Sequence, residues 1–313
     1  MSLNKYLGRG LTRRDLMRHT AGGLGVAIGS TFAPPLMFSQ IAHAQAQAAK
    51  NGKILVIVEL SGGNDGLNTV VPYGDDAYYK ARPKIGVKKA DTRRIDDYSG
   101  FHKNMLGFEK LYKDGKLAVV HGTGYANPSY SHFVSMAYWH TANPGGGEQF
   151  GWVGRTADAM EPTAKTPNML VNVDVSQSLA VRSDKHVPLV FDNPDNFKRA
   201  AFFSEGEAIK TIGETSAVKG NETQKWIAGV SQTAFAAEAA VRKAWADYKS
   251  PVNYGITGLA LRQVAALIGA GFPTQLYYIA YRNNSFDTHV YQVGVHERLL
   301  TYTADPIEAY ADV

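Results

Sequence analysis

The sequence predicts an α/β domain, in which a mainly parallel β-sheet carries helices on both faces. Two observations predict it. Short, almost continuously apolar runs rich in β-branched residues, such as residues 54–60, are typical of strands buried on both faces of a parallel sheet. Segments with apolar residues at helical spacing lie between these runs, and this alternation indicates crossover helices between parallel strands.

The expected elements follow one another along the chain. Strands are predicted over residues 54–60, 117–121, 169–175, 187–191 and 275–281. The first strand stops at Ser61-Gly62-Gly63 and the second at Gly122-Thr123-Gly124, which are turns of small residues. Helices are predicted over residues 131–141, 152–160, 222–248 and 258–269, and from His289 to the end of the chain.

Residues 1–44 have the pattern of a twin-arginine export signal. Arg13 and Arg14 precede a weakly apolar segment over residues 21–37, and Ala42-His43-Ala44 has the small-x-small form that signal peptidase cuts. A membrane anchor needs about 20 strongly apolar residues, whereas this segment is rich in glycine and contains Pro34-Pro35. We therefore expect delivery to the periplasm or beyond by the twin-arginine machinery, and a mature domain over residues 45–313 without a stable membrane span.

Charge argues against nucleic-acid binding, and composition excludes thiolate metal ligands. The formal net charge is +5, but residues 1–44 carry five basic side chains against one acidic, so residues 45–313 retain only about +1. The basic character belongs to the signal, which argues against nucleic acid as a partner. The chain has no cysteine, so a metal would be held by histidine, carboxylate or hydroxyl groups.

Polar residues follow the first predicted strand, in a Gly-rich turn that contains Asp65. Ligands of open α/β sheets bind beyond the carboxyl ends of the strands, so this carboxylate is a candidate metal ligand. The alternative is an Asx turn, in which the side chain bonds only to nearby backbone. No Lys-Ser or Lys-Thr pair ends the turn, which excludes a Walker phosphate loop.

A second polar cluster follows the predicted strand 117–121 and includes Ser131 and His132. Ser131 stands where a helix is expected to begin, so it is a candidate helix cap. Its hydroxyl would also lie at the positive end of the helix dipole, which favours a developing alkoxide or a bound phosphate or sulfate. His132 can act as a metal ligand, as a general acid or as a packed core residue.

The third cluster, Phe286-Asp287-Thr288-His289, follows the last predicted strand. Asp287 and His289 are close enough in sequence for both to reach one ion. If the helix begins near His289, that residue and His296 share one face, two turns apart. His121 and His140 are interpreted as structural.

Several of these segments together resemble the bacterial domain-of-unknown-function family numbered 1501, whose members carry twin-arginine signals. The matching segments are Gly62-Gly63-Asn64-Asp65-Gly66-Leu67-Asn68-Thr69-Val70-Val71-Pro72, Tyr78-Tyr79-Lys80-Ala81-Arg82-Pro83, Leu117-Ala118-Val119-Val120-His121, residues 127–133, Gly151-Trp152-Val153-Gly154-Arg155 and Phe286-Asp287-Thr288-His289. They cover most of the mature chain in order.

That family is placed in the alkaline phosphatase and sulfatase-like superfamily, so the resemblance implies a two-metal hydrolase. It implies that Asp65 binds one metal, that Ser131 is a nucleophile activated by metal coordination, and that Asp287 and His289 belong to the other metal site. Family members continue with an Asp-His-Gly motif that completes the ligands, so we expect residues 45–313 to be an incomplete domain, with its C-terminal part missing.

The sequence therefore leads to one principal hypothesis and two alternatives. The first is an exported hydrolase of phosphate or sulfate esters, or the N-terminal part of one, which takes a small anionic ester and uses zinc or a similar divalent metal. The catalytic candidates are Ser131 and His132. The metal-ligand candidates are Asp65, Ser131, Asp287, His289 and His296. The first alternative is a non-catalytic envelope protein that binds a partner. The second is a metal-free serine esterase, although Ser131 lacks a Gly-x-Ser-x-Gly elbow.

Overall fold

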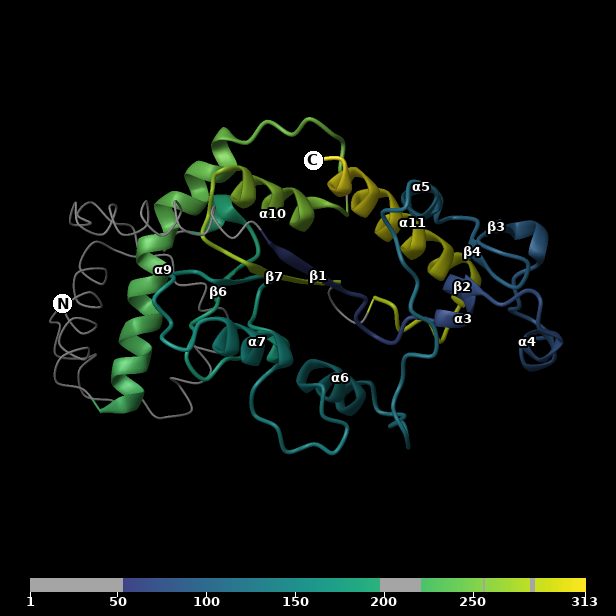
Figure 1. Ribbon diagram of the computed structural model, residues 1–313, viewed down its shortest axis with the longest axis horizontal. Coiled ribbons are helices and arrows are strands. Elements are labelled where there is room, and N and C mark those ends of the chain that lie inside the picture. Colours follow the sequence, from purple (N-terminus) through teal and green to yellow (C-terminus); the bar gives the residue numbers. More distant parts are fainter. Residues whose placement is uncertain (1–52, 198–220, 256, 282–284) are drawn as a thin grey trace, which may run out of the picture.

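The main sheet has four parallel strands in the order β1-β7-β5-β6 (Figure 1). It is seen in a computed structural model that describes residues 53–197, 221–255, 257–281 and 285–313. The strands are β1 (Leu55–Glu59), β5 (Leu170–Val173), β6 (Leu189–Phe191) and β7 (Leu276–Ala280). In the register, Leu276 lies opposite both Leu55 and Leu170. Four of the predicted strands, and the parallel arrangement, are thereby confirmed.

Helices cover both faces of this sheet, as the continuous apolar strands predict. Tyr277 and Ile279 of β7 belong to a buried cluster with α9 (Glu222–Asp247) and α10 (Leu259–Gly269). Leu276 and Tyr278 alternate with them and belong to a cluster with α7 (Trp152–Met160) and the 3-10 turn η3 (Leu179–Val181). The side-chain period of two along β7 thus supplies both cores.

A small antiparallel sheet, which the sequence did not predict, stands beside the main one (Figure 1). Its strands are β2 (Val70–Val71), β4 (Gly100–His102) and β3 (Thr92–Arg94), in the order β2-β4-β3. The accompanying elements are α3 (Gly66–Thr69), α4 (Asp76–Ala81), η2 (Lys89–Asp91) and α5 (Leu106–Lys113), and η4 (Pro194–Asn196) follows β6. Strands of two or three residues are too short to show an alternating apolar pattern, so sequence periodicity misses them.

The last helix, α11 (Gln292–Ala311), joins the small sheet to the main one by packing against α5. Their backbones are so close that a Cβ on Gly107 would lie 2.5 Å from the carbonyl oxygen of Ala304. The helix begins at Gln292, after Tyr291 with a φ of 56°, and not at His289 as expected. His289 therefore lies in the loop before the helix.

The predicted strand over residues 117–121 is wrong: in the described part of the chain this segment belongs to no helix or strand. Leu117 and Val119 pack against the buried cluster of Phe101, Met105, Phe286, Leu300 and Ala304, whereas Val120 is 80% exposed. The alternating pattern is therefore satisfied by packing, without a neighbouring strand.

The sequence also predicted an export signal and the absence of a stable membrane span. The proposed signal over residues 1–44 lies outside the described residues. Among the helices that the structure describes, none combines the length and the apolar character needed to cross a bilayer.

Candidate metal site

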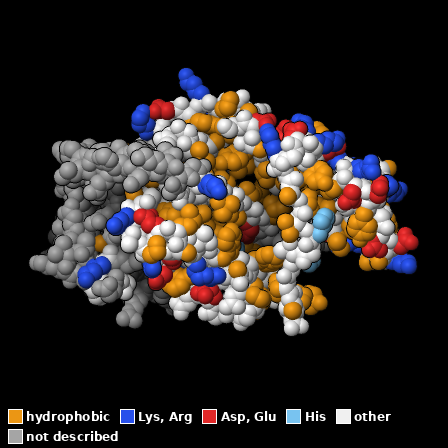
Figure 2. All heavy atoms as spheres, viewed as in Figure 1, with side chains coloured by type: hydrophobic (Ala, Val, Ile, Leu, Met, Phe, Trp, Pro, Cys, Tyr) orange, Lys and Arg blue, Asp and Glu red, His pale blue; other side chains and the backbone are white. Residues whose placement is uncertain are grey.

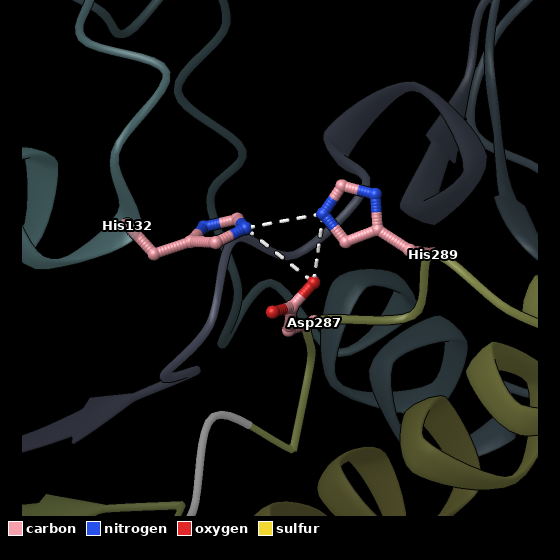
Figure 3. A group of neighbouring side chains, drawn as sticks. All are labelled: His132, Asp287 and His289. Carbon is pink, nitrogen blue, oxygen red and sulfur yellow. Dashed lines mark hydrogen bonds and ion pairs between the residues drawn. The ribbon is translucent and has the colours of Figure 1, made fainter.

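Three side chains from two distant parts of the sequence converge on one point (Figure 3). His132 Nε2 lies 3.4 Å from Asp287 Oδ1 and 3.3 Å from His289 Nε2. His289 Nε2 lies 2.9 Å from the same Asp287 Oδ1. We call His132, Asp287 and His289 the metal trio, because their ligand atoms all lie within 4.8 Å of one another.

His132 reaches the trio from the start of α6 (His132–Thr141). Ser131 caps this helix, with its Oγ accepting a hydrogen bond from the N–H of Val134 at 3.4 Å. The imidazole rests against Gly63, where a Cβ would lie 3.1 Å from His132 Cε1. Gly63 also has a φ of 85°, which a residue with a side chain rarely adopts. The Gly-rich turn after β1 therefore leaves room for the His132 ring.

Asp287 and His289 reach the trio from the loop between β7 and α11. Two buried residues alternate with them: Phe286 packs in the core below, and Thr288 is 8% exposed. The N–H of Phe286 donates to the carbonyl of Ser61 at 3.0 Å, which ties the loop to the end of β1. The loop also turns tightly at Asp287, where the N–H of Thr288 donates to the carbonyl of Phe286 at 3.1 Å, and Asp287 and His289 are exposed beside His132.

The trio is open to solvent on one side. The exposed fractions of the side chains are 34% for His132, 29% for Asp287 and 76% for His289. Figure 2 shows histidine side chains at the surface on the side of the molecule where the small sheet lies. Two imidazoles and one carboxylate form a donor set that suits zinc, and three protein ligands leave a position for water or substrate. The three side chains are thus of kinds that can hold a divalent metal ion.

Asp65, a predicted metal ligand, lies outside the trio. Its Oδ2 forms an ion pair with Arg82 at 2.5 Å and accepts a hydrogen bond from Gln292, while its Oδ1 accepts the N–H of Asn68 at 3.3 Å. The Asx-turn alternative therefore describes its local contacts, with the carboxylate capping α3. Arg82 supplies the positive charge beside this carboxylate.

His296 is also separate from the trio. It is 2% exposed, and its Nε2 lies 2.8 Å from Asn64 Oδ1. Burial holds the pKa of His296 below its ordinary value, which favours a neutral ring. Because α11 begins at Gln292, His289 and His296 do not share a helix face, and the expected pairing of these two is not formed.

Ser131 is next to the trio in sequence, and its described hydroxyl contact is the helix cap. The residue is exposed, at the start of a helix of ten residues. The first N–H groups of a helix and the helix dipole together favour an anion at this place. The site therefore combines metal-type ligands with an anion-favouring helix start.

A polar cluster that the sequence analysis did not identify lies further along α6. His140 Nε2 is 2.7 Å from Glu59 Oε2, and the hydroxyl of Tyr278 donates to the same oxygen. Burial raises the pKa of Glu59, but the hydrogen bonds from His140 and Tyr278 outweigh burial and hold this pKa below its ordinary value. A sequence signal was present, since Glu59 is the one charged residue of an apolar strand.

Comparison with known proteins adds no relative. No family model matches the chain, and no match is found among curated proteins or solved structures.

Proposed function

We propose that the protein is an exported metal-dependent hydrolase of phosphate or sulfate esters, or the N-terminal part of one. The observation that carries the proposal is the metal trio, in which residues 132, 287 and 289 bring two imidazoles and a carboxylate to one point. This assigns His132 to metal binding in place of general acid catalysis. The resemblance of the segments described above to the family numbered 1501 motivates the choice of ester substrates, although no family model matches the chain.

The chemistry divides between the ion and the helix start. A bound divalent ion would polarise the ester and stabilise the oxygen that leaves. The start of α6 would orient the anionic group, because backbone N–H groups and the helix dipole are directed there. In this proposal Ser131 contributes the attacking hydroxyl from the same helix start. The exposed fraction of His289, 76%, leaves the trio accessible to a substrate from solvent.

Metal binding is tested first, with purified protein and Zn²⁺ followed by calorimetry. Asp287→Asn and His289→Gln should each weaken Zn²⁺ binding by at least about tenfold, since each removes one of the three ligands. His121→Gln is a matched control, because it removes an exposed histidine outside the trio. Equal affinity for the control and both ligand variants would contradict the proposed site.

Hydrolysis is tested with p-nitrophenyl phosphate and p-nitrophenyl sulfate, before and after chelation. Ser131→Asn separates the two roles of Ser131, because asparagine caps a helix as well as serine does but has no hydroxyl to attack the ester. We expect Ser131→Asn to fold and bind Zn²⁺ but to lose hydrolysis. Hydrolysis of acyl esters that survives chelation would instead identify a metal-free serine esterase. Metal binding without any hydrolysis would indicate a binding protein.

Export is tested separately from chemistry. Residues 1–44 fused to a folded reporter should direct it to the periplasm, and replacing Arg13 and Arg14 by lysine should retain the reporter in the cytoplasm. A reporter that is exported equally well without the arginine pair would contradict the twin-arginine route.

A further inference from the structure

One face of α6 lies along the end of β1 and the turn that follows it. Three contacts connect them: Glu59 with His140, Ser61 with Met136, and Gly63 with His132. Along the turn the contacting residues are two apart, and along α6 they are four apart. Four helical residues rise about 6 Å, and two residues of extended chain span at most about 7 Å. The two segments can therefore keep all three contacts at once, running in opposite directions.

The contact at His140 is the strongest of the three. The side chains of His140 and Glu59 are only 14% and 17% exposed, and their hydrogen bond of 2.7 Å joins a carboxylate to an imidazole. The Ser61 Oγ to Met136 Sδ contact is longer, at 3.7 Å, and thioether sulfur is a weak acceptor. Gly63 and His132 are neighbours without a hydrogen bond, close enough that a Cβ on Gly63 would lie 3.1 Å from His132 Cε1.

α6 is also held from other directions: it contacts the 3-10 turn η3 and α7, and the hydroxyl of Tyr125 lies 2.5 Å from Ser135 Oγ. Thr141 is the buried residue of this helix, and large side chains such as Phe133 and Trp139 are mostly exposed. At its C-terminal end, Arg155 of α7 donates to the carbonyl of Thr141 at 2.7 Å. Helix stability in proteins comes mostly from tertiary packing, and the buried hydrogen bond of His140 with Glu59 adds the contact that sets how α6 lies against β1.

We propose that His140 is a positioning residue for the metal trio: by binding Glu59 it holds α6 in register along β1, and so keeps His132 against Gly63. This inference rests on the proposed function, because it assigns to His140 the task of fixing the geometry of the metal trio. The influence of His140 is mechanical, since eight helical residues separate it from His132, a distance of about 12 Å.

Tyr278 offers a matched control for this idea. Tyr278 belongs to β7, and its hydroxyl donates to the same Glu59 oxygen, so this hydrogen bond joins two strands of the sheet and not α6 to the sheet. Tyr278→Phe keeps the ring beside His140, whose centroid is 6.3 Å away, and removes one hydrogen bond from the same cluster. It therefore tests whether loss of stability alone weakens the trio.

The experiment measures Co²⁺ binding by absorption spectroscopy, in variants whose fold is first checked by circular dichroism. His140→Ala should weaken Co²⁺ binding about tenfold, the size of effect seen when the support of a metal ligand is lost. His140→Gln should restore binding, because its amide can donate to Glu59 from a similar position. Tyr278→Phe should lower thermal stability and leave Co²⁺ affinity unchanged. If His140→Ala fails to fold, Glu59→Gln weakens the same contact from the other side and is expected to reduce affinity.

Two results would overturn the proposal: unchanged Co²⁺ affinity in His140→Ala, or an equal loss of affinity in Tyr278→Phe. Amide hydrogen exchange of α6 in metal-free protein separates this inference from the proposed function. If the wild type binds no Co²⁺, the proposed function fails. Faster exchange over residues 132–141 in His140→Ala, but not in Tyr278→Phe, would then still support the positioning role, and equal exchange would refute it.

Discussion

Replacing Gly63 by alanine would displace His132 without altering any polar group of the metal trio. The added Cβ would lie 3.1 Å from His132 Cε1 and 3.2 Å from Nδ1. Ordinary van der Waals contacts of a Cβ lie between 3.4 and 4 Å. The imidazole must therefore move by a few tenths of an ångström or more, away from the turn.

Two separate costs follow from this geometry. The φ of 85° at Gly63 is unfavourable for a residue with a side chain, which costs about 1 kcal/mol of folding stability. The displacement of the ring acts on binding, because a functional site holds its groups to within about 0.5 Å and a shift of a few tenths of an ångström uses most of that range. We expect metal affinity to fall about tenfold, which corresponds to about 1.4 kcal/mol.

Gly115→Ala is the matched control, because it carries the backbone cost alone. Its φ is 68°, and an added Cβ there would meet nothing within 4 Å. Urea denaturation should show a similar loss of stability in both variants, and calorimetry with Zn²⁺ should show weaker binding only in Gly63→Ala. If both variants bind Zn²⁺ like the wild type, the contact between Gly63 and His132 does not limit the site, and the reasoning is refuted.

Three further predictions concern stability. The pKa of Glu59 is held below its ordinary value of 4.5 in the folded protein, so its contribution is present above pH 4.5 and is lost as the pH falls through the folded pKa. Glu59→Gln should therefore lower the free energy of unfolding by about 2 kcal/mol near neutral pH. In urea denaturation, the difference between this variant and the wild type should shrink below pH 4.5. Burial lowers the pKa of His102 from 6.5, so the unfolded chain takes up a proton at higher pH than the folded protein does. The free energy of unfolding should therefore fall as the pH drops below 6.5, and it should fall less in His102→Gln. Gly107→Ala should cost at least about 2 kcal/mol in thermal or urea denaturation, because its Cβ would overlap the carbonyl of Ala304; a normal stability would mean that α5 and α11 can separate freely.

Much of the main sheet was predictable because its strands carry a local signal. Strands β5 and β7 are short apolar runs buried on both faces, which makes such runs nearly continuous in sequence, and the edge strand β1 has the same apolar run although it is only partly buried. The same local signal was misleading for residues 117–121, where Leu117 and Val119 are covered by packing from one side. A pattern of apolar residues reports burial, and it does not report whether a partner strand is present.

The candidate site was predictable only in its local half. Asp287 and His289 are neighbours on one loop, so their proximity follows from the sequence itself. His132 is 157 residues from His289, and its place beside them depends on how α6 lies along the end of β1. Asp65 was also a predicted metal ligand, but it lies outside the trio and its carboxylate pairs with Arg82.

The sequence by itself thus determined the four strands of the main sheet, the helices that cover it and the residue types that can hold a metal. Tertiary structure alone decided which of those residues meet. Contacts such as His132 with Asp287, or Asp65 with Arg82, depend on the relative positions of separate elements, and local patterns carry no information about them.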